Sequence, residues 1–381
     1  MTVWVQSPFD NLPAEGYRKQ RYWLMSEAFA AAGHAVVYFT TDFNHGTKRR
    51  REIAPSSTSE IDVRVVPVPP YSRNVSMARV VSHIAYARRF ERDAAALLPR
   101  PDVVVSATPT LGAATAALRL ARRFGARFVL DIQDAWPETF CRLLPRGFSW
   151  TGKFVLAPMY FMARRLYREA DVVTGVSERY RGICGRDDYR LFYHGIESSS
   201  PCAAFAGRRP AGRVRTRLVY VGNIGEGYDL ETVARAVALD RRLTLDIAGR
   251  GPREGVLRAL VASMGLSERV VFHGYLGADA LRGLLADCDI GVIPMRDDSW
   301  VGLPYKLGDY VAAGLPVVSS LHGECGKIIE AGRLGETYDF GDAASALAAI
   351  RALERHDNVS LPECLMAERI YPAYVEHVVG S

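Results

Sequence analysis

Residues 289–320 read DIGVIPMRDDSWVGLPYKLGDYVAAGLPVVSS and contain a complete strand–helix–strand unit. The two short apolar runs, 290–294 and 316–319, are typical of strands that are buried on both faces. Between them, Pro304 favours the first turn of a helix and Gly314 is typical of the position just after a helix ends. Two parallel strands need such a crossover, so this unit predicts an α/β protein with a parallel sheet.

The same alternation extends in both directions from this unit, which predicts two doubly wound, Rossmann-like domains. The strand-like runs are 3–6, 34–40, 63–68, 103–107, 127–132, 172–176 and 191–193 in the first half, and 218–221, 243–248, 270–273, 290–294 and 316–319 in the second. The helical stretches between them include 20–32, 79–97, 113–124, 230–239, 255–264 and 278–286.

The boundary between the two domains is marked by a change in composition. Residues 198–216 are rich in Ser, Gly, Pro and Arg and have no apolar period, as in a linker. We therefore expect a first domain over 1–197 and a second over 217–366. The closing segment 367–381 is amphipathic and could return to the first domain, although its destination cannot be read from the sequence.

The composition is that of an ordinary globular protein, with 49% apolar and 24% charged residues in a chain of 381. A net charge of +6 suits an acidic ligand or an anionic lipid surface but is too diffuse to indicate nucleic acid. We expect neither a signal peptide nor a membrane-spanning segment, and a cytoplasmic protein. Neither a disulfide framework nor a zinc site is indicated by the scattered cysteines, Cys141, Cys184, Cys202, Cys288, Cys325 and Cys364.

Three polar or glycine-rich turns fall at the carboxyl ends of predicted strands, where open parallel sheets bind their ligands. The first holds Gly222, Asn223, Gly225 and Gly227, whose backbone amides could approach a phosphate at the start of the next helix. A plain tight turn is at least an equal explanation. The turn also lacks the GxGxxG dinucleotide pattern, which argues against hydride transfer.

The second turn places Arg250 between two glycines, where it could face an anion or simply be a solvated surface arginine. The third is His273-Gly274-Tyr275, where the glycine would let a flat nucleobase lie against backbone groups. His273 could equally be a hydrogen-bonded, partly buried histidine, so we do not expect it to be catalytic.

The helix after Pro304 carries the strongest candidates. Lys306 adds a mobile charge to a first turn whose dipole already favours anions, and Asp309 on the same face could accept hydrogen bonds from two ribose hydroxyls. Gly302, Leu303 and Leu307 flank them as further donor-site candidates. An exposed Lys–Asp pair worth about 0.3–0.5 kcal/mol is the alternative, and the position between two strands favours a functional role.

These motifs together resemble glycosyltransferase family 4, the retaining nucleotide-sugar enzymes of the GT-B fold. In family order, the chain has YVGN at 220–223, AGRGP at 248–252, VVFHGYL at 270–276 and LPYKLGDYVAAGLPVV at 303–318. The likeness covers nearly the whole chain. A closer likeness is to the bacterial surface-polysaccharide subgroup that includes N-acetyl-L-fucosamine transferases, through DIQDAWPE at 131–138.

The resemblance implies two Rossmann-like domains facing across a cleft, and a role for each candidate on the donor side. Lys306 would neutralise the donor diphosphate, with Arg250 as a possible helper. Asp309 matches the glutamate that holds the ribose, and Gly274 would hold the base. A UDP-sugar is expected more than a GDP-sugar, and no metal or other cofactor is expected.

On the acceptor side, the resemblance implies that Asp134 and Glu138 bind the sugar or orient the acceptor, and with Lys306 they form the expected catalytic set. The loop Glu15-Gly16-Tyr17-Arg18 matches the family's flexible loop near the transferred sugar. A lipid-linked or soluble glycan acceptor is implied, most directly a polyprenyl-diphosphate-linked saccharide.

Several positions depart from the family pattern. Val301 stands where the first of two paired glutamates is expected, and Asp297 or Asp298 could substitute for it. Asn223 and Glu226 stand where many members have an arginine and a lysine. Gln133 stands where many have a histidine. A degenerate nucleotide-sugar-binding subunit therefore stays open as an alternative to a transferase. A nucleotide-sugar 2-epimerase or hydrolase on the same fold is a second alternative.

Membrane association is expected from residues 142–168, which mix aromatic and basic side chains. An amphipathic helix packed on the first domain is the alternative. The basic run 48–51 is interpreted as a solvated loop or a second lipid contact rather than a nucleic-acid site. The expected location is therefore the cytoplasm, with peripheral association at the inner face of the cell membrane as the expected membrane contact.

Overall fold

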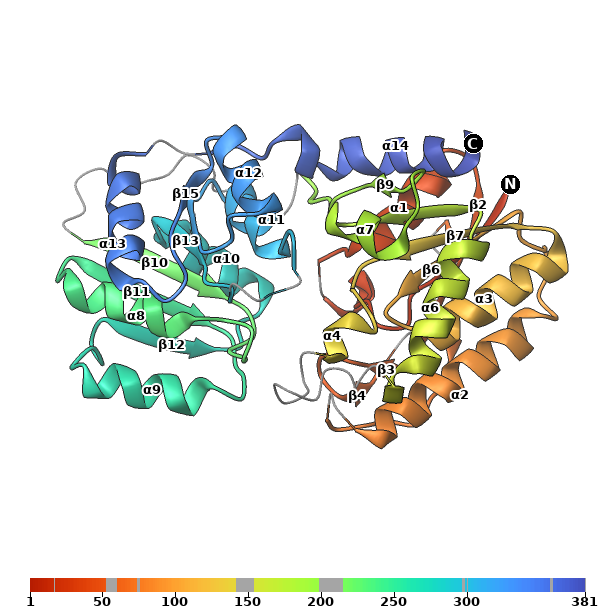
Figure 1. Ribbon diagram of the computed structural model, residues 1–381, viewed down its shortest axis with the longest axis horizontal. Coiled ribbons are helices and arrows are strands. Elements are labelled where there is room, and N and C mark those ends of the chain that lie inside the picture. Colours follow the sequence, from red (N-terminus) through yellow and green to blue (C-terminus); the bar gives the residue numbers. More distant parts are fainter. Residues whose placement is uncertain are drawn as a thin grey trace. The chain divides into compact units, whose positions relative to one another are not determined.

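A computed structural model of the protein describes residues 1–16, 18–52, 60–73, 76–141, 154–198, 215–296, 299, 301–356 and 359–380. The chain forms two compact units, one of Met1–Tyr193 with Glu368–Ser381 and the other of His194–Ala367 (Figure 1). Of the linker expected over 198–216, only 198, 215 and 216 are among the described residues. Both units are α/β layers, as the alternation of runs predicts.

The first unit is built on a seven-stranded parallel sheet. In sheet order its strands are β5 (Ile61–Val66), β2 (Ala35–Thr41), β1 (Thr2–Gln6), β6 (Val103–Thr108), β7 (Arg127–Ile132), β8 (Val172–Gly175) and β9 (Arg190–Leu191). All six residues of β6 are buried, because helices cover both faces of the sheet.

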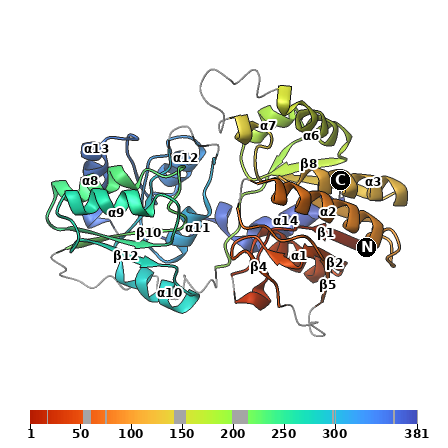
Figure 2. The ribbon, with the colours of Figure 1, turned by 90° about the horizontal axis from the view of Figure 1, so that it is seen from below.

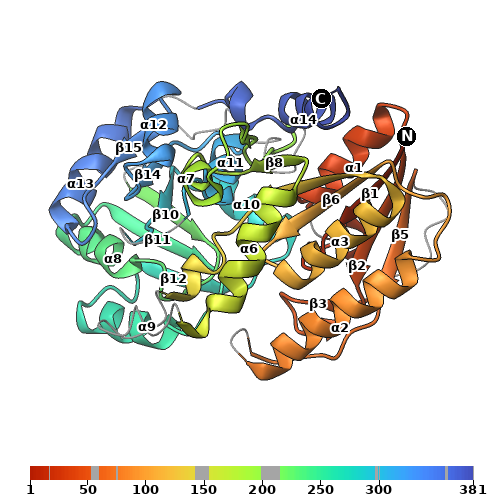
Figure 3. The same ribbon diagram turned by 45° about the vertical axis from the view of Figure 1, so that its right-hand side comes forward.

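Helices lie in two layers around this sheet. On one face, α3 (Leu111–Phe124) packs between α2 (Met77–Ala94) and α6 (Ala157–Glu169), and α7 (Arg179–Cys184) follows α6 (Figure 3). The other face carries α1 (Arg21–Ala31) and α14 (Ala367–Gly380). Short elements complete the unit: η1 (Pro13–Glu15), α4 (Glu138–Cys141) and the antiparallel pair β3 (Phe43–Asn44) and β4 (Arg49–Arg50).

The closing helix α14 packs against the first unit. Its Tyr374 is fully buried and meets the ring of Phe29 of α1, with the ring centroids 6.2 Å apart. Arg127 at the start of β7 donates from Nη1 to the carbonyl oxygen of Val378 (2.6 Å). The chain therefore begins and ends in the same unit (Figures 1 and 2).

The second unit is built on a six-stranded parallel sheet. In sheet order its strands are β12 (Val270–Gly274), β11 (Leu243–Ala248), β10 (Thr216–Val221), β13 (Ile290–Ile293), β14 (Val317–Ser319) and β15 (Gly335–Thr337). Its helices are α8 (Leu230–Leu239), α9 (Glu254–Ser263), α10 (Ala278–Asp287), α11 (Tyr305–Ala312), α12 (Glu324–Ala331) and α13 (Ala343–Ala352), followed by the short η3 (Leu353–Arg355) and η4 (Glu363–Leu365).

The core of this unit lies between the sheet and helices α8, α9 and α13. Leu245 and Ile247 of β11 and Ile290 of β13 are fully buried against apolar residues of these helices. Figure 2 shows α10 on the opposite side of the sheet. From β10, successive strands are added on one side as β11 and β12 and on the other side as β13, β14 and β15. The carboxyl ends of β10 and β13 therefore form the switch point, where open α/β sheets bind ligands.

Some elements differ from the expected ones. The strand expected over 191–193 is the two-residue β9, one position earlier. The β3–β4 pair and β15 were not expected, because two- or three-residue strands are too short to show an apolar alternation. Among the described residues, no helix combines the length and the apolar character needed to cross a bilayer.

Candidate functional site

Two of the predicted turns of the second unit are in direct contact with each other. The N–H of Gly222, after β10, donates to the carbonyl oxygen of Ala248, and the N–H of Ile224 donates to that of Arg250 (2.9 and 3.0 Å). Gly249 has φ +153°, and a Cβ atom there would lie 1.8 Å from the carbonyl oxygen of Gly222. Only glycine fits this close approach of two backbones. The glycines therefore serve the packing of adjacent turns at the carboxyl edge of the sheet.

Asn223 shapes the same turn with its side chain. A Cβ atom at Gly225 would lie 2.6 Å from Asn223 Nδ2, and one at Gly251 would lie 2.7 Å from Asn223 Oδ1. The amide therefore folds back over two glycines. Glu226 is exposed and pairs with Arg253 (3.1 Å). This part of the turn supplies backbone and amide groups rather than positive charge.

Lys306 lies over the turn after β10. A Cβ atom at Gly222 would be 2.9 Å from Lys306 Nζ, so the ammonium group sits against the glycine backbone. Nζ donates to the hydroxyl of Tyr228 (3.2 Å) and lies 4.3 Å from the centre of the Tyr228 ring and 5.2 Å from that of Tyr220. Such cation–π contacts hold a charge in place without neutralising it.

The two tyrosines were missed by the sequence reasoning. Tyr220 lies within the apolar run of β10 and has the pattern of a core residue, and its hydroxyl donates to the carbonyl oxygen of Asn223 (2.6 Å). Tyr228 follows the glycine turn, with no local pattern to mark it. An aromatic residue on each side of a glycine turn is the signal that could have indicated a cation there.

Helix α11 is fixed by Tyr310, which sets the position of Lys306. The hydroxyl of Tyr310 accepts a hydrogen bond from the N–H of Val221 (2.8 Å). Its ring packs on Gly291 of β13, where a Cβ atom would lie 2.4 Å from the ring. Burial raises the pKa of Tyr310 far above its ordinary value, so the hydroxyl stays protonated. The helix is thereby attached to two neighbouring strands at the switch point.

The other candidates on and before α11 have different surroundings. Asp309 lies about one helical turn after Lys306 in α11 and is half-buried. Its main-chain oxygen accepts a hydrogen bond from the N–H of Ala313 (3.2 Å). Leu303, Leu307 and Gly302 are buried, so the two leucine side chains anchor the helix instead of presenting themselves to a ligand. Of this group, only Lys306 and Asp309 offer polar side chains.

Arg250 lies beside the third turn. Gly274 has φ +69°, and a Cβ atom there would be 3.4 Å from Arg250 Nε. The guanidinium group therefore packs over the glycine that ends β12. Tyr275, next in the chain, is exposed. Arg250 and Lys306 thus rest on glycines at the ends of the edge strand β12 and the central strand β10.

His273 is hydrogen-bonded to a residue of the neighbouring strand β11. Its Nε2 hydrogen-bonds Asp246 Oδ1 (2.7 Å), and Asp246 also accepts from Arg217 (3.0 Å). Asp246 is nearly fully buried within β11. The histidine side chain is therefore held against the sheet by a structural ion-pair cluster.

In the first unit, Asp131 is a structural residue. It forms a bidentate ion pair with Arg21 (2.8 Å for both bonds) and accepts from the hydroxyls of Tyr22 and Thr174 (2.8 and 2.7 Å). Burial alone would raise the pKa of Asp131. The positive charge of Arg21 and the hydrogen bonds from Arg21 and Thr174 instead hold this pKa below its ordinary value. The carboxylate fixes α1 to β7 and β8.

Asp134 and Glu138 follow β7 at the carboxyl edge of the first sheet. Asp134 accepts from Trp136 Nε1 and from the Thr139 hydroxyl (3.1 Å each), and burial nevertheless raises the pKa of this carboxyl. Burial also raises the pKa of Glu138, whose Oε2 is buried without a hydrogen-bond partner among the described residues. An orphaned buried carboxylate oxygen is a group that a ligand hydroxyl could satisfy.

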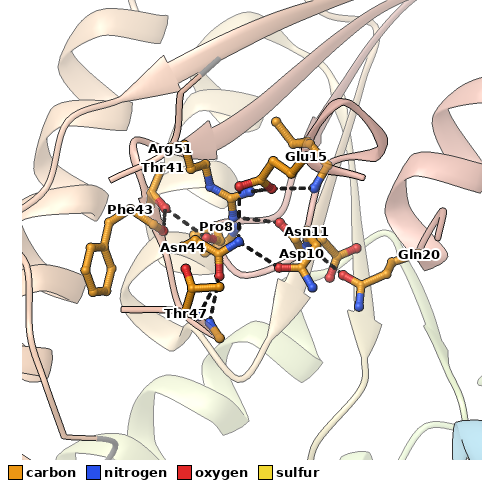
Figure 4. A network of polar contacts seen from close by, with 12 residues as sticks. Pro8, Asp10, Asn11, Glu15, Gln20, Thr41, Phe43, Asn44, Thr47 and Arg51 are labelled. Carbon is orange, nitrogen blue, oxygen red and sulfur yellow. Dashed lines mark hydrogen bonds and ion pairs between the residues drawn. The ribbon is translucent and has the colours of Figure 1, made fainter. Parts of the chain in front are cut away.

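Glu15, in the loop after β1, is held by several polar contacts. Glu15 forms an ion pair with Arg51 and accepts from the N–H of Leu12 (2.8 Å) and from Asn44 Nδ2 (3.1 Å) (Figure 4). Gly16 follows with φ +79°, and Arg18 is a described residue with contacts of its own. Tyr17 lies outside the described residues.

The basic run 48–51 is also different from a wholly solvated loop. The Arg51 side chain is completely buried, and its Nη2 donates to the carbonyl oxygen of Asp10 (2.7 Å) (Figure 4). Arg50 is half-exposed and pairs with Asp42. The pattern of four successive cations gave no sign that the last one is buried, since its partners lie about forty residues earlier.

Two further expectations concern groups that are only partly described. Asp297 and Asp298, considered as substitutes for the glutamate absent at Val301, lie outside the described residues, as does 142–153 of the proposed membrane segment. The described part of that segment packs Leu166 and Tyr167 of α6 in the core but exposes Phe154 and Phe161. Among the described residues, no group of three or more His, Cys, Asp or Glu side chains is arranged to hold a metal ion.

Comparison with protein families matches both units. Residues 19–190 match the family described as "Glycosyl transferase 4-like domain", and residues 215–356 match the one described as "Glycosyl transferases group 1". The first match lies within the first compact unit and the second within the second.

Among curated proteins, the chain is 25% identical over 216 residues to the putative colanic acid biosynthesis glycosyltransferase WcaL of Escherichia coli, covering 52% of this chain and 51% of that protein. It is 26% identical over 251 residues to the putative colanic acid biosynthesis glycosyl transferase WcaI of the same species, covering 61% and 60%. The aligned segments thus span about half of these relatives.

Among solved structures, the whole chain resembles two-domain GT-B proteins. Anabaena HepE in complex with UDP and glucose superimposes with a TM-score of 0.63 at 13% identity, covering 99% of this chain and 95% of that one. The apo form of the lipopolysaccharide outer core galactosyltransferase WaaB gives 0.64 at 13% identity, covering 100% and 99%. At these identities the likeness establishes the fold, which is GT-B with two Rossmann-like domains.

Proposed function

We propose that this chain, which joins a glycosyl transferase 4-like domain to a glycosyl transferases group 1 domain, moves a sugar from a nucleotide-sugar donor to a glycan in bacterial surface-polysaccharide synthesis. The observation that carries the proposal is the position of Lys306 Nζ, against the backbone of Gly222 at the switch point of the second sheet. Both domain matches and the names of the curated relatives support a glycosyltransferase.

The donor diphosphate is the group that Lys306 would bind. A diphosphate leaving group gains negative charge as the glycosidic bond breaks, and a fixed cation stabilises that charge without reorganisation. Tyr220 and Tyr228 hold the ammonium in place through their rings, and Gly222 removes the side chain that would block its approach. Arg250, over Gly274, supplies a second cation at the same edge.

The rest of the donor is assigned to neighbouring groups. Asp309 would accept hydrogen bonds from the ribose hydroxyls, and the Gly274 turn would hold the base through its main chain. We favour UDP over GDP as the nucleotide, because HepE, of the same fold, was crystallised with UDP. Val301 cannot contact the sugar as a carboxylate would, so that contact is absent or comes from another group.

The transfer itself is proposed to retain the anomeric configuration. The bond from the anomeric carbon to the diphosphate oxygen breaks, and a bond to the acceptor oxygen forms on the same face of the sugar. The proton of the acceptor hydroxyl passes to the departing diphosphate oxygen. Asp134 and Glu138 would position the acceptor, since Glu138 has a buried oxygen that an acceptor hydroxyl could satisfy. We propose that no metal is required.

The acceptor is proposed to be a lipid-linked saccharide at the inner face of the membrane. Phe154, Val155 and Phe161, at and before α6, have 79%, 80% and 69% of their surface exposed. Aromatic side chains of this kind enter the headgroup region of a bilayer, and a net charge of +6 favours anionic lipid.

The test compares turnover of UDP- and GDP-sugars with and without a lipid-linked acceptor extracted from a polysaccharide-producing strain. A transferase consumes donor only with acceptor, and the product linkage, read by NMR, should retain the donor's anomeric configuration. Donor turnover without acceptor would instead indicate the hydrolase or 2-epimerase. Binding of nucleoside diphosphate without turnover of any donor would indicate the degenerate subunit.

A further inference from the structure

We infer that a groove on the outer surface of the first unit binds the single hydrocarbon chain of a lipid whose phosphate or diphosphate end lies at Arg79. The groove is formed by one face of α2, the first half of α3, the end of α4 and the start of α6, and is called the α2–α6 groove below. As the binder of an acceptor's lipid it rests on the proposed function. As a lipid-binding site it stands on its own observations.

The α2–α6 groove has the size and lining of a ligand site. Its volume is about 740 Å³, within the range of small-molecule pockets, and its lining residues in the described part of the chain all belong to the first unit. Helix α3 lies between α2 and α6 (Figure 3). Residues of all three helices line the groove. The apolar lining includes Val80, Ile84, Leu111, Phe140, Met159 and Met162.

The apolar residues of α2 are unusually exposed. Met77 has 75% of its surface exposed, and Val80 and Ile84 have 47% each. They recur every three or four residues, so they form a stripe along one face of the helix. A contiguous apolar surface of this kind marks a binding surface, and the two methionines of α6 can adapt to a flexible chain.

One end of the groove carries a cation that is held by aromatic rings. The Arg79 guanidinium lies 5.4 Å from the centre of the Phe9 ring and 5.5 Å from that of Trp136. Its Nε donates to His83 Nε2 (3.3 Å). Arg79, His83 and Trp136 also line the groove, so the cation and the apolar surface belong to one site.

The groups around Arg79 favour an anion. The His45 and His83 rings each contact the Phe9 ring at a tilt, with centroids 5.1 and 5.0 Å from its centre, and Lys48 lies beside His45. Burial, with the nearby Lys48 and Arg79, lowers the pKa of His45 to about 3, and burial with Arg79 lowers that of His83 to about 4. Neutral imidazoles and two cations are good hydrogen-bond donors for a phosphate. Asp134 is an acidic group near Arg79, and burial raises the pKa of its carboxyl.

The shape of the site selects a chain with a charged end. From Met77 to Arg88, α2 runs about 16 Å along the groove, at about 1.5 Å a residue. This length accommodates about three isoprene units or a similar alkyl chain. The anion site lies at the carboxyl edge of the sheet, near Asp134 and Glu138, so a saccharide attached to the phosphate would begin where the acceptor residues lie. A free anion would not use the apolar lining.

The binding test uses isoprenyl monophosphates of increasing chain length, with inorganic diphosphate as a probe without a chain. Affinity, followed by calorimetry with the full chain, should rise at least about tenfold from the shortest to the longest lipid because more apolar surface is buried. Ile84→Asp should weaken binding of the longest lipid about tenfold or more. Val81→Asp is the matched control: Val81 is 51% exposed on the same helix but does not line the groove, and its variant should bind normally.

The charged end is tested by Arg79→Gln, which should weaken binding of every lipid phosphate about tenfold while the increase with chain length persists. Arg92→Gln, a change on the exposed end of α2, should leave binding unchanged. Affinity that does not depend on chain length, or Ile84→Asp that binds like wild type, would overturn the inference. So would loss of vesicle binding by Ile84→Asp with no change for the lipid phosphates, because the groove would then contact a bilayer.

Binding of UDP, followed by the shift in melting temperature, separates this inference from the proposed function. Lipid binding without UDP binding would leave the groove standing and remove the donor site. UDP binding without lipid binding would leave the donor site standing and remove the groove.

Discussion

Arg21 and Arg51 of the first unit are buried and paired with carboxylates, whereas Lys306 of the second unit rests on tyrosine rings and a glycine backbone. Among the residues that the structure describes, no carboxylate forms an ion pair with Lys306. A cation whose charge is matched by a neighbouring carboxylate is committed to the fold. A cation held in place by rings keeps its charge for a ligand. Arg21 and Arg51 therefore stabilise the fold, whereas Lys306 is available to a ligand.

The largest effect is expected on stability, at the buried ion pair of Arg21 and Asp131. Asp131→Asn leaves the Arg21 guanidinium buried without its counter-charge, which should lower the free energy of unfolding by about 3–5 kcal/mol. Urea unfolding measures the loss. Asp62→Asn, in an exposed pair with Arg64, should cost less than about 1 kcal/mol. Equal losses for the two variants would mean that burial of the pair does not matter.

The second largest effect is expected on turnover, when Lys306 is removed. Lys306→Ala should reduce donor turnover by about 10²–10³-fold, as expected for loss of one preorganised charge at a leaving group. Steady-state kinetics with the cognate donor measures it. The melting temperature should change little, because Lys306 pairs with no described carboxylate. Lys327→Ala, an exposed lysine of α12, is the control and should retain full activity. Activity of Lys306→Ala near that of wild type would remove this residue from the mechanism.

A smaller effect is expected in the loop after β1. Glu15→Gln keeps the shape of the side chain but removes the charge that faces buried Arg51, and should destabilise the protein by about 1–3 kcal/mol. Glu91→Gln, which breaks the exposed pair with Arg119, should be nearly silent. If Glu15→Gln left stability unchanged but abolished turnover, Glu15 would belong to the sugar site rather than to the fold.

The smallest effect concerns pH. Burial raises the pKa of Asp10 to about 6, despite a hydrogen bond from the N–H of Tyr22. The folded state therefore binds a proton more tightly than the unfolded state, and this group should lower stability as pH rises from about 4 to 6. Asp10→Asn should remove that part of the slope in thermal unfolding measured across this range. A slope identical to wild type would show that Asp10 titrates normally.

The sequence was most informative where a function needs local backbone geometry. The glycines at 222, 249 and 274 and the helix after Pro304 could be read from their neighbours, and the structure brings Arg250 and Lys306 to the same edge. Sequence reasoning missed contacts between distant residues. Nothing near Glu15 indicates Arg51, and nothing near Lys306 indicates Tyr228, because these pairs form only when the loops of different strands meet.

The α2–α6 groove illustrates the same limit. Met77, Val80 and Ile84 recur at helical spacing, which is also the pattern of an ordinary core-facing helix. Only the packing of α3 and α6 shows that this stripe is left exposed. Periodicity predicts a helix and its apolar face, but the partner of that face depends on the whole fold.

The most direct test is a crystal structure of the protein with UDP. The diphosphate should lie within hydrogen-bond distance of Lys306 Nζ and of the backbone at Gly222, with the ribose near Asp309. Nucleotide bound at another part of the protein, with Lys306 still resting on Tyr228 and making no contact to phosphate, would contradict the assignment of the donor site.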